Sequence, residues 1–254
     1  MHIAKFRTRN YWEGSRFILK NMRKEVLLKI KHKLIVSCQA RVGWPMYGPE
    51  IMAAFAKAAQ DGGASGIRAT GVDNIAKIKE CVTLPIIGIN KQFVDGYDVY
   101  ITPTYQSAKE ILDLGIEIIA IDATSRVRPG NESVEQIVKL IRKNYPDVLI
   151  MGEISTVEEA MRILPLHFDI ISTTLSGYTE ESNTVTSVNL ELIRQIKEIT
   201  NTPIIAEGKI KNEVEALETL EAGAYAVVVG TAITRPEIIT KWFVQEVDKF
   251  QEIL

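Results

Sequence analysis

The chain has 254 residues, of which 46% are hydrophobic and 24% charged, a composition typical of one globular domain with a large core. The formal net charge of -2 gives no electrostatic reason to expect a nucleic-acid partner, and two cysteines provide neither a disulfide framework nor metal-ligand spacing. Because no apolar run approaches the roughly 18 residues of a membrane span and no signal-peptide core is visible, we expect a cytoplasmic protein without membrane contact.

Residues 1–33 form a basic and aromatic segment that differs in composition from the rest of the chain. Four apolar residues near its end have the spacing of a helix face: Val26, Leu27, Leu28 and Ile30. We therefore expect a helical N-terminal extension that closes the bottom of the domain formed by residues 34–254. The alternative is that its basic residues contact a membrane surface or a nucleic acid.

Eight short apolar runs follow, and nearly all of them end in a polar or charged residue. They are Leu34–Cys38, Ala64–Arg68, Pro85–Lys91, Ile116–Asp122, Val148–Glu153, Phe168–Thr173, Pro203–Glu207 and Ala224–Val229. Strands that are apolar on both faces belong to a parallel sheet covered by helices. Eight of them, alternating with helix-length segments, predict an α/β fold: a single-domain, closed (β/α)8 barrel of the TIM type, with its active site at the carboxyl ends of the strands.

The segments between the runs carry helix signals. We expect helices over Glu50–Asp61, Val72–Cys81, Ser107–Leu114, Ser133–Asn144, Thr156–Leu164, Leu190–Thr200, Glu213–Glu221 and Pro236–Phe250. Ser133, followed by Gln136 three residues later, is the expected N-cap of its helix. A Gly/Pro-rich loop with two aromatic residues occupies positions 40–49, and an extra short run, Val99–Thr104, is expected at the rim of the barrel.

Lys91 and Glu207 end the third and the seventh run. An apolar strand can desolvate a lysine at its end, which lowers the pKa of the ammonium and suits it to acid–base or Schiff-base chemistry. In a ring of eight strands the third faces the seventh, so both side chains would point into one cavity. Removal and return of a proton at a carbon atom need groups arranged in this way. The alternative for each residue is an ordinary solvated position on the rim.

The loops after the last two strands carry glycines where barrels of this type commonly hold a phosphate. Gly208 follows the seventh strand, and Gly230 and Thr231 follow the eighth. Glycine permits a close approach of the backbone, and a helix N-terminus supplies a favourable dipole. Arg235 could add a charged fork. We therefore expect a phosphate at this end of the cavity, although such glycines also occur in purely structural turns.

Polar residues end or follow four further strands. Arg68 suits bidentate binding of an oxyanion, or an ion pair with a neighbouring strand-end acid. Glu153 could bind sugar hydroxyls, orient Lys91 or form that ion pair. Gln39 directly follows the first strand, and Asp122 is expected to be a ligand contact or a helix cap.

Several kinds of site are not indicated by the sequence. None of the three histidines lies at the end of an expected strand, so we expect neither a histidine-based triad nor a metal centre. The chain also contains neither the glycine motif of dinucleotide-binding folds nor the phosphate-binding loop of nucleoside triphosphatases.

Eight short motifs occur in order along residues 34–245. They are Val36–Ala40, Gly66–Ala69, Pro85–Lys91, Ile101–Thr104, Ile119–Thr124, Thr173–Thr179, Ala206–Gly208 and Val229–Pro236. Together they resemble the N-acetylmannosamine-6-phosphate 2-epimerase family. The resemblance implies an epimerase of sialic acid catabolism that uses no cofactor, acts on a phosphorylated N-acetyl amino sugar and often forms a homodimer.

The resemblance also implies roles for single residues. Lys91 would be the acid–base group at C2 of the sugar, and Glu207 would be its carboxylate partner in the proton exchange. The residues implied to hold the sugar and its acetamido group are Gln39, Arg68 and Glu153. Those implied to lie at or near the phosphate and the rim are Gly208, Gly230, Thr231 and Arg235.

Three features depart from the family pattern. The family usually has aspartate at the position of Glu153, and aliphatic and basic residues at the positions of Asn90 and Gln92. Residues 1–33 and the Glu180–Ser187 loop are also atypical. Two alternatives to an epimerase therefore stay open: a lysine Schiff-base aldolase acting on a phosphosugar, and a phosphosugar-binding barrel that has lost its activity through these changes.

Overall fold

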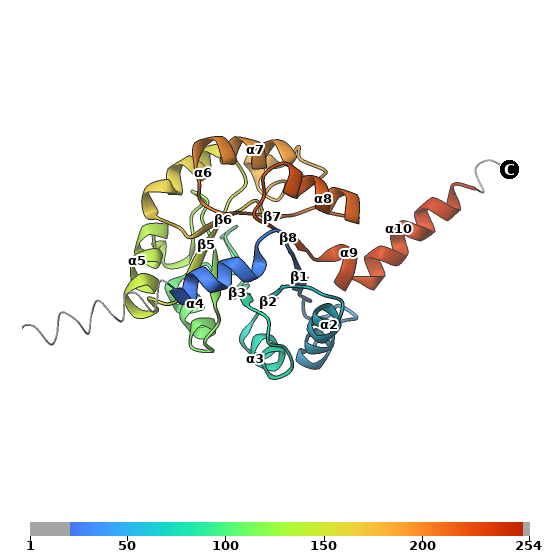
Figure 1. The fold of residues 1–254 in the computed structure, drawn as a ribbon, viewed down its shortest axis with the longest axis horizontal. Helices are drawn as coiled ribbons and strands as arrows, with labels where there is room; N and C mark the ends of the chain where they lie inside the picture. Colours follow the sequence, from blue (N-terminus) through green and yellow to red (C-terminus); the bar gives the residue numbers. More distant parts are fainter. Residues whose placement is uncertain (1–20, 251–254) are drawn as a thin grey trace, which may run out of the picture.

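The computed structural model describes residues 21–250, and these contain a closed barrel of eight parallel strands that pair in sequence order (Figure 1). The strands are β1 (Leu34–Cys38), β2 (Gly66–Thr70), β3 (Ile86–Ile89), β4 (Ile118–Asp122), β5 (Leu149–Glu153), β6 (Ile170–Ser172), β7 (Ile204–Glu207) and β8 (Ala226–Val229). Each overlaps one of the predicted apolar runs. The pairing of β1 with β8, in which Val36 lies opposite Val229, closes the ring. The predicted (β/α)8 barrel is therefore confirmed.

Helices connect the strands on the outside of the barrel. They are α2 (Pro49–Asp61), α3 (Val72–Cys81), α4 (Tyr105–Leu112), α5 (Val134–Asn144), α6 (Val157–Ile163), α7 (Leu190–Ile199), α8 (Glu213–Glu221), α9 (Thr231–Thr234) and α10 (Pro236–Asp248), with 3-10 turns at Pro129–Asn131, Leu164–Leu166 and Glu180–Ser182. The predicted cap of α5 is confirmed, because Ser133 Oγ accepts from Gln136 N at 3.1 Å. By contrast, α4 begins two residues earlier than predicted, because Thr104 caps it and Ser107 completes the capping box.

The hydrophobic core has an inner and an outer layer. The inside of the barrel is filled largely by isoleucines, among them Ile35, Ile87 and Ile118. A second layer lies between the strands and the surrounding helices and contains Ile67 and Ile119. Each such side chain, fully buried, stabilises the fold by about 1.5–3 kcal/mol relative to an exposed one. Burial on both faces explains why the strands read as nearly continuous apolar runs.

Residues 21–30 form a helix whose apolar side packs against the barrel (Figure 1). Ile30 is fully buried in the inner layer of the core, and Val26 and Leu27 pack against that layer. Leu28, which was predicted to share this face, is 55% exposed, so that part of the prediction is wrong. The face is narrower than predicted because neighbouring positions on a helix point in different directions.

Two polar contacts attach this helix to the barrel. Tyr225 Oη donates to the carbonyl oxygen of Leu27 at 2.9 Å, and Arg23 forms an ion pair with Asp169. Both partners precede a strand, so the helix lies at the amino-terminal end of the barrel, opposite the predicted active site. The remainder of the extension, residues 1–20, lies outside the described residues.

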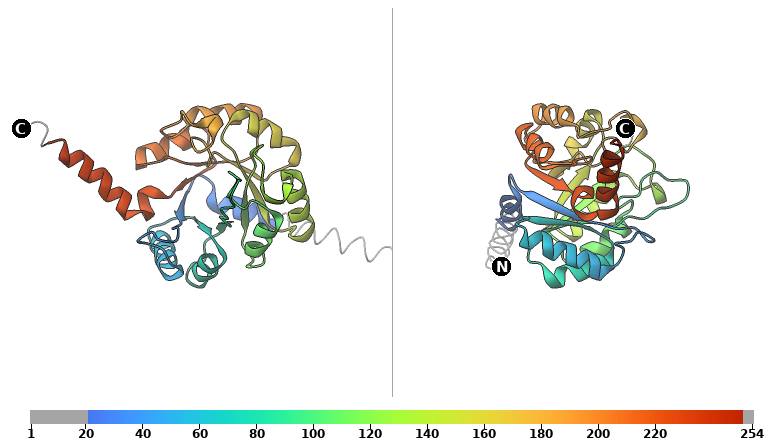
Figure 2. Two further views of the ribbon diagram at one scale, coloured as in Figure 1. Left: turned by 180° about the vertical axis from the view of Figure 1, so that it is seen from behind. Right: turned by 90° about the vertical axis from the view of Figure 1, so that its right-hand side faces the viewer.

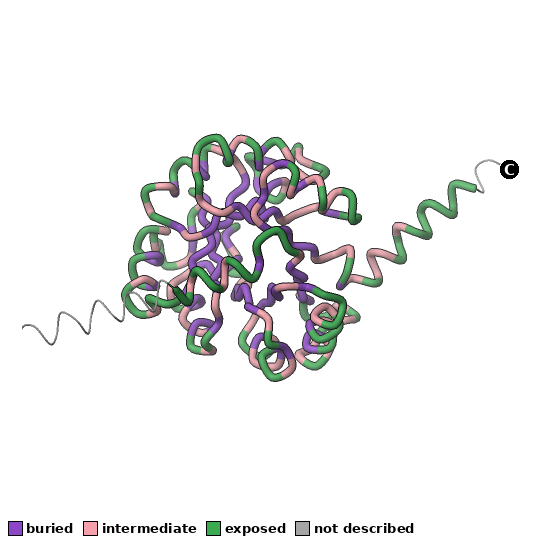
Figure 3. Tube along the Cα trace, viewed as in Figure 1, coloured by how far each residue is buried: buried purple, intermediate pink, exposed green. Residues whose placement is uncertain are grey.

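The last helix, α10, leaves the barrel and projects away from it (Figures 1 and 2). None of its residues is buried, and in Figure 3 the tube of this helix is pink and green without purple. Phe243, Val247 and Phe250 lie on successive turns of this segment and are 70%, 69% and 64% exposed. The predicted terminal helix is present, but it does not cover the barrel wall beside β8, where a (β/α)8 barrel normally places its last helix.

Candidate active site

A cavity of about 420 Å³ opens at the carboxyl ends of the barrel strands. Eight of the nine predicted site residues line it: Gln39, Arg68, Lys91, Glu207, Gly208, Gly230, Thr231 and Arg235. They belong to β1, β2, β3, β7 and β8 or to the loops that follow these strands. The cavity therefore occupies one arc of the barrel mouth rather than the whole of it.

Arg68 is the centre of a buried ion-pair cluster. Its side chain projects from β2 and is only 2% exposed, although a guanidinium is normally hydrated. Nη1 donates to Glu207 Oε1 at 2.7 Å, and Nη2 donates to Glu153 Oε1. The predicted pairing with a strand-end acid is therefore confirmed, with two acids in place of one. Glu153, the ninth predicted residue, ends β5 and is fully buried. It contacts Arg68, which lines the cavity, but does not line the cavity itself.

Glu207 ends β7 and is held at both its backbone and its side chain. Thr173 Oγ1 donates to Glu207 O at 3.0 Å and accepts from Glu207 N at 3.1 Å, while Thr174 Oγ1 donates to Glu207 Oε2 at 3.2 Å. Burial raises the pKa of the Glu207 carboxyl to about 7; Arg68 opposes this rise and the nearby Glu153 carboxylate adds to it. Glu207 can therefore accept or release a proton near neutral pH.

Lys91 lies just beyond β3, where the chain pairs briefly with the predicted rim segment. Lys91 and Ile101 form an isolated antiparallel bridge, and Lys91 N donates to Thr70 Oγ1 at 3.2 Å. Nζ lies 5.8 Å from the centroid of the Tyr100 ring, and no carboxylate of residues 21–250 lies within ion-pair distance of it. Burial, together with the positive charge of Arg68, lowers the pKa of the Lys91 ammonium to about 8.

Lys91 and Glu207 thus form a matched pair. They come from β3 and β7, which are four strands apart in the closed ring, and both line the same cavity. Their pKa values, about 8 and about 7, lie close together and near neutrality, so a proton can leave one side of a bound molecule and arrive from the other.

The two unusual neighbours of Lys91 point away from the cavity. Asn90 is 7% exposed, and its Nδ2 donates to Ser107 O at 3.1 Å and to Glu110 Oε2 at 2.8 Å. Gln92 Nε2 donates to the same Glu110 oxygen at 3.4 Å. These side chains fasten the end of β3 to α4, and neither is part of the cavity lining.

At the predicted phosphate end of the cavity, segments of the backbone lie close to one another. Gly208 has φ of +110°, a conformation that favours glycine. A Cβ at Gly230 would lie 3.2 Å from Ser37 Cβ, so β8 and β1 approach closely there. Thr231 begins the short helix α9 directly after Gly230. Arg235 Cζ lies 3.7 Å from the centroid of the Trp44 ring, and Arg235 Nε donates to Glu237 Oε1 at 2.8 Å.

Buried polar atoms without a hydrogen-bond partner mark the same site. Within the described part of the chain they are Gln39 Oε1, Arg68 Nε and Glu153 Oε2, and all three belong to predicted site residues. Gln39 is otherwise held by its Nε2, which donates to Ser37 Oγ at 2.7 Å. Gln39 and Arg68 line the cavity, whereas Glu153 lies behind Arg68. Folded proteins satisfy most of their buried polar groups, so unsatisfied atoms in a cavity wall are typical of a place where a polar ligand completes the bonding.

Positive charge dominates the cavity lining. Its basic side chains are Arg41, Arg68, Lys91, Lys209, Lys211 and Arg235, whereas Glu207 is its one carboxylate among the described residues. Arg41, Lys209 and Lys211 were missed by the sequence analysis, as were Trp44 and Tyr100. The signals available were the aromatic, Gly/Pro-rich loop at 40–49 and the lysines that follow Gly208. This excess of cations favours an anionic ligand.

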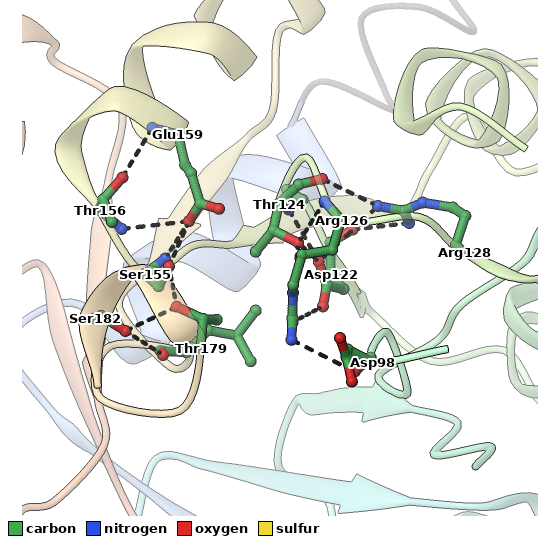
Figure 4. Close-up of polar contacts among 12 residues, drawn as sticks. Asp98, Asp122, Thr124, Arg126, Arg128, Ser155, Thr156, Glu159, Thr179 and Ser182 are labelled. Atoms are coloured by element: carbon green, nitrogen blue, oxygen red, sulfur yellow. Dashed lines mark hydrogen bonds and ion pairs between the residues drawn. The ribbon is translucent and has the colours of Figure 1, made fainter. Parts of the chain in front are cut away.

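The other arc of the barrel mouth, at the ends of β4 and β5, is called the closed arc because its strand-end side chains are tied up in internal hydrogen bonds (Figure 4). A separate cavity of about 510 Å³ is lined by the loop after β4, including Thr124, Arg126 and Arg128. Asp122 is fully buried and accepts from Thr124 N at 2.9 Å, from Thr124 Oγ1 at 2.7 Å and from Arg126 Nη2 at 2.7 Å. Arg128 is 3% exposed and donates from Nη1 to Asp122 O at 3.0 Å. The expectation that Asp122 caps a helix is wrong, because α5 begins well downstream with Ser133 as its cap.

A second hydrogen-bond network, also drawn in Figure 4, connects the loops after β5 and β6. Ser155 Oγ and Ser155 N both donate to Glu159 Oε2 at 2.7 Å. Thr179 Oγ1 donates to Ser155 Oγ at 2.9 Å and lies 2.9 Å from Ser182 Oγ. These polar groups already have partners, so they offer few free donors or acceptors to a ligand.

Two kinds of feature are missing from residues 21–250. None of the helices there combines the length and the apolar character that crossing a membrane requires. No three histidine, cysteine, aspartate or glutamate side chains of this region are grouped as metal ligands.

Comparison with known proteins places these observations in a family context. A family model described as "Putative N-acetylmannosamine-6-phosphate epimerase" matches residues 52–249. A protein of Caldanaerobacter subterraneus subsp. tengcongensis described as "Putative N-acetylmannosamine-6-phosphate 2-epimerase" is 48% identical over 223 residues, which cover 88% of this chain and 94% of that protein. A protein of Clostridioides difficile with the same description is 44% identical over 223 residues, which cover 88% and 99%.

Solved structures are similar as well. The N-acetylmannosamine-6-phosphate 2-epimerase from Clostridium perfringens matches with a TM-score of 0.83 and 45% identity, over 86% of this chain and 95% of that one. The thiamine phosphate pyrophosphorylase from Pyrococcus furiosus matches with a TM-score of 0.56 at 16% identity, over 82% of this chain and 89% of that one. At that identity the second match reflects the fold alone.

Proposed function

The chain belongs to the N-acetylmannosamine-6-phosphate epimerase family, and we propose that its cavity interconverts N-acetylmannosamine 6-phosphate and N-acetylglucosamine 6-phosphate by proton exchange at C2. The observation that carries this proposal is the matched pair: Lys91 and Glu207 line one cavity from opposite strands and have pKa values of about 8 and about 7. The reaction inverts one carbon centre and is redox-neutral, so acid–base groups are sufficient for it.

The proposed chemistry balances with one proton out and one proton in. In the open-chain sugar the C2 hydrogen is α to the C1 carbonyl, so its removal leaves an enolate. One member of the pair takes the proton from one face, and the other delivers a proton to C2 from the opposite face. The C2–H bond breaks and forms again with inverted configuration, and the carbonyl is restored. In the reverse direction Lys91 and Glu207 exchange roles.

The main energetic obstacle is the negative charge that develops on the C1 oxygen. Arg68, which is fixed between two carboxylates, contacts Glu207 directly, and Lys91 adds a second positive charge to the site whenever its amine holds the proton. Charges that are already in position inside a secluded cavity stabilise such an oxyanion without reorganising first. Glu153 contributes by holding Arg68 in place, and Gln39 offers its free Oε1 to the acetamido N–H.

Anchoring is assigned to the other end of the cavity. We assign the phosphate to the backbone around Gly208, Gly230 and Thr231, which lines this end of the cavity, with the guanidinium of Arg235 as a further donor. Binding energy from a group remote from C2 can be used to orient the reacting carbon. A phosphorylated sugar is charged and does not pass a lipid bilayer unaided, so the proposed site of action is the cytoplasm.

The deciding experiment is an NMR assay of purified protein with N-acetylmannosamine 6-phosphate in D2O. We expect the 2-epimer to form and deuterium to appear at C2 in substrate and product. A Schiff-base aldolase would instead be trapped on Lys91 by borohydride, and its lowered pKa makes that outcome chemically accessible. A binding protein without activity would shift the sugar resonances and produce no epimer. Either of these results would contradict the proposal.

We also propose that α10 makes the protein a homodimer. The helix has no buried residue and packs mainly on α9, and it leaves uncovered the wall beside β8, where α8 exposes Val214 and Leu217 by 58% and 56%. The α10 helix of a second copy would cover the open wall of the first, and the α10 helix of the first would cover that of the second. Such a reciprocal exchange gives a closed dimer with two-fold symmetry. The apolar stripe on α10 then becomes buried instead of facing water.

Sedimentation velocity tests the dimer. Replacing Phe243 and Val247 together by glutamate places charges on the stripe, and we expect a monomer. Gln245→Glu, on the same helix, is the matched charge control and is expected to remain dimeric. A monomeric wild-type protein at micromolar concentration would overturn the proposal.

A further inference from the structure

The loop between β1 and α2 presents an arginine that is held by aromatic rings. Arg41 Cζ lies 4.9 Å from the centroid of the Phe93 ring and 5.5 Å from the centroid of the Trp44 ring. Arg235 also stacks on the indole of Trp44, with its Cζ 3.7 Å from the ring centroid. Two guanidinium groups are thus gathered around one indole, and all three side chains line the cavity.

Arg41 differs from the other arginines of the cavity in its lack of an acidic partner. Arg68 is paired with two carboxylates, and Arg235 is paired with Glu237. Within residues 21–250 no carboxylate lies within ion-pair distance of Arg41. A guanidinium that stacks on rings uses its faces for these contacts and keeps its in-plane N–H donors for another group.

The position of the loop brings Arg41 towards the predicted phosphate end. β1 pairs with β8, so the loop after β1 is the direct neighbour of the Gly230–Thr231 turn that follows β8. Gly230 approaches Ser37 of β1 closely, at 3.2 Å from a Cβ placed on the glycine to Ser37 Cβ. Arg41 and Arg235 therefore reach the cavity from adjacent strands.

From this geometry we infer that Arg41 is a substrate-binding residue, which, held by Trp44 and Phe93, binds the substrate's phosphate together with Arg235. The inference rests on the proposed function and adds a binding group to it. A phosphate monoester carries about 1.5 to 2 negative charges near pH 7, and Arg235 already shares its charge with Glu237, so a second guanidinium adds to the neutralisation. The planar guanidinium groups of Arg41 and Arg235, one on each side of the phosphate, can donate to its three terminal oxygens.

The same contacts connect phosphate binding to the catalytic lysine. Phe93 stacks on Tyr100 with ring centroids 5.1 Å apart and an interplanar angle of 16°, and Tyr100 lies beneath the ammonium of Lys91. A phosphate that engages Arg41 would thereby tighten the loop that carries Phe93 and Tyr100. Arg41 is thus expected to act on substrate binding first, and on turnover only through this loop.

Binding is measured most clearly without turnover. In a Lys91→Met background, calorimetry with N-acetylglucosamine 6-phosphate compares Arg41→Met with Arg194→Met, an exposed arginine on α7 that serves as the control. We expect the Kd to rise about tenfold or more for Arg41→Met, the effect of losing one charge-assisted contact. Arg194→Met is expected to leave Kd unchanged. Inorganic phosphate, as a second probe, should lose affinity in parallel.

The unphosphorylated sugar separates phosphate binding from general damage to the cavity. N-acetylglucosamine should bind Arg41→Met as it binds the background protein, however weakly. Trp44→Ala should reproduce the loss of phosphosugar affinity, whereas Trp44→Phe should retain most of it, because an aromatic platform remains. An unchanged Kd for the phosphosugar in Arg41→Met, or an equal loss for both sugars, would overturn the inference. These binding measurements do not depend on epimer formation. Failure of this inference can therefore be distinguished from failure of the proposed reaction.

Discussion

The two arcs of the barrel mouth carry similar residues and behave differently. On the arc formed by β7, β8, β1, β2 and β3, polar side chains line a cavity and some of their atoms lack partners. On the arc formed by β4 and β5, Asp122 is fully buried and its carboxylate is already bonded within its own loop. Glu207 and Asp122 are both strand-end carboxylates, yet only Glu207 reaches the cavity.

This difference teaches that a polar residue at a strand end is a candidate for chemistry only if the fold places it in the wall of a cavity that a ligand can enter. The loop after β4 contains Thr124, Arg126 and Arg128, which together satisfy Asp122. The loop after β7 contains glycine and lysine, which supply no side-chain acceptor that competes for the Arg68 guanidinium. Substitutions on the open arc should therefore alter activity, and substitutions on the closed arc should alter stability.

The largest effect is expected from Lys91→Met on the open arc. Loss of the acid–base ammonium should lower the epimerisation rate by about 10³-fold, measured by NMR. The melting temperature should stay near that of the wild type, because Lys91 has no ion pair within the described residues. Lys57→Met, on the exposed face of α2, is the control and should keep full activity. Near-normal turnover in Lys91→Met would remove this residue from the mechanism.

Asp122→Asn tests the closed arc. The substitution keeps the shape but removes the charge that faces Arg126 and Arg128, so two guanidinium groups lose their counter-ion in a buried setting. We expect the free energy of unfolding to fall by about 3 kcal/mol in denaturant titrations, while the folded protein keeps its activity within a few-fold. Asp61→Asn, at an exposed ion pair, should cost little. A large loss of kcat without loss of stability would contradict the comparison.

The pH dependence of kcat/KM sharpens the description of the open arc. Proton exchange needs one acid and one base, so Lys91 and Glu207 must together hold one proton, whichever of them holds it. With pKa values of about 7 and about 8, both are protonated at lower pH and neither at higher pH. We expect a bell-shaped profile with its maximum between these values, falling about tenfold per pH unit on either side. A flat profile from pH 6 to 9 would contradict this assignment.

The smallest effect is expected at the cap of α5, away from both arcs. Ser133→Ala removes the acceptor for Gln136 N and should lower the free energy of unfolding by about 1 kcal/mol. Ser133→Asp retains an acceptor and should cost much less. Epimerisation by either variant should match the wild type, and any change in KM would show that this helix end influences the cavity.

Much of the fold could be predicted because it depends on local patterns. The bounds of β1, α3 and α8 agree with the predicted ones at both ends, since apolar runs and helix breakers define them. Two details failed where a choice between neighbouring residues was involved. Thr104 and Ser107 can both cap a helix, and the spacing of Leu28 alone did not reveal that it faces water.

The residues of the candidate site could be predicted from the sequence, but most of the contacts between them could not. Strand position selected Lys91 and Glu207, because the ring of strands fixes where their ends point. The sequence indicated that Arg68 could pair with a strand-end acid, but not that it would pair with two, because those contacts join residues far apart in the chain. The stacking of Arg41 was missed for the same reason: its two rings come from different loops.

Arg235 and Pro236 are consecutive residues with different tasks. The first lies on Trp44 at the cavity, and the second begins the helix that departs from the barrel. One peptide bond therefore joins the residue proposed to bind the phosphate to the helix proposed to form the dimer. If both proposals hold, subunit association and substrate binding are coupled at this point of the chain.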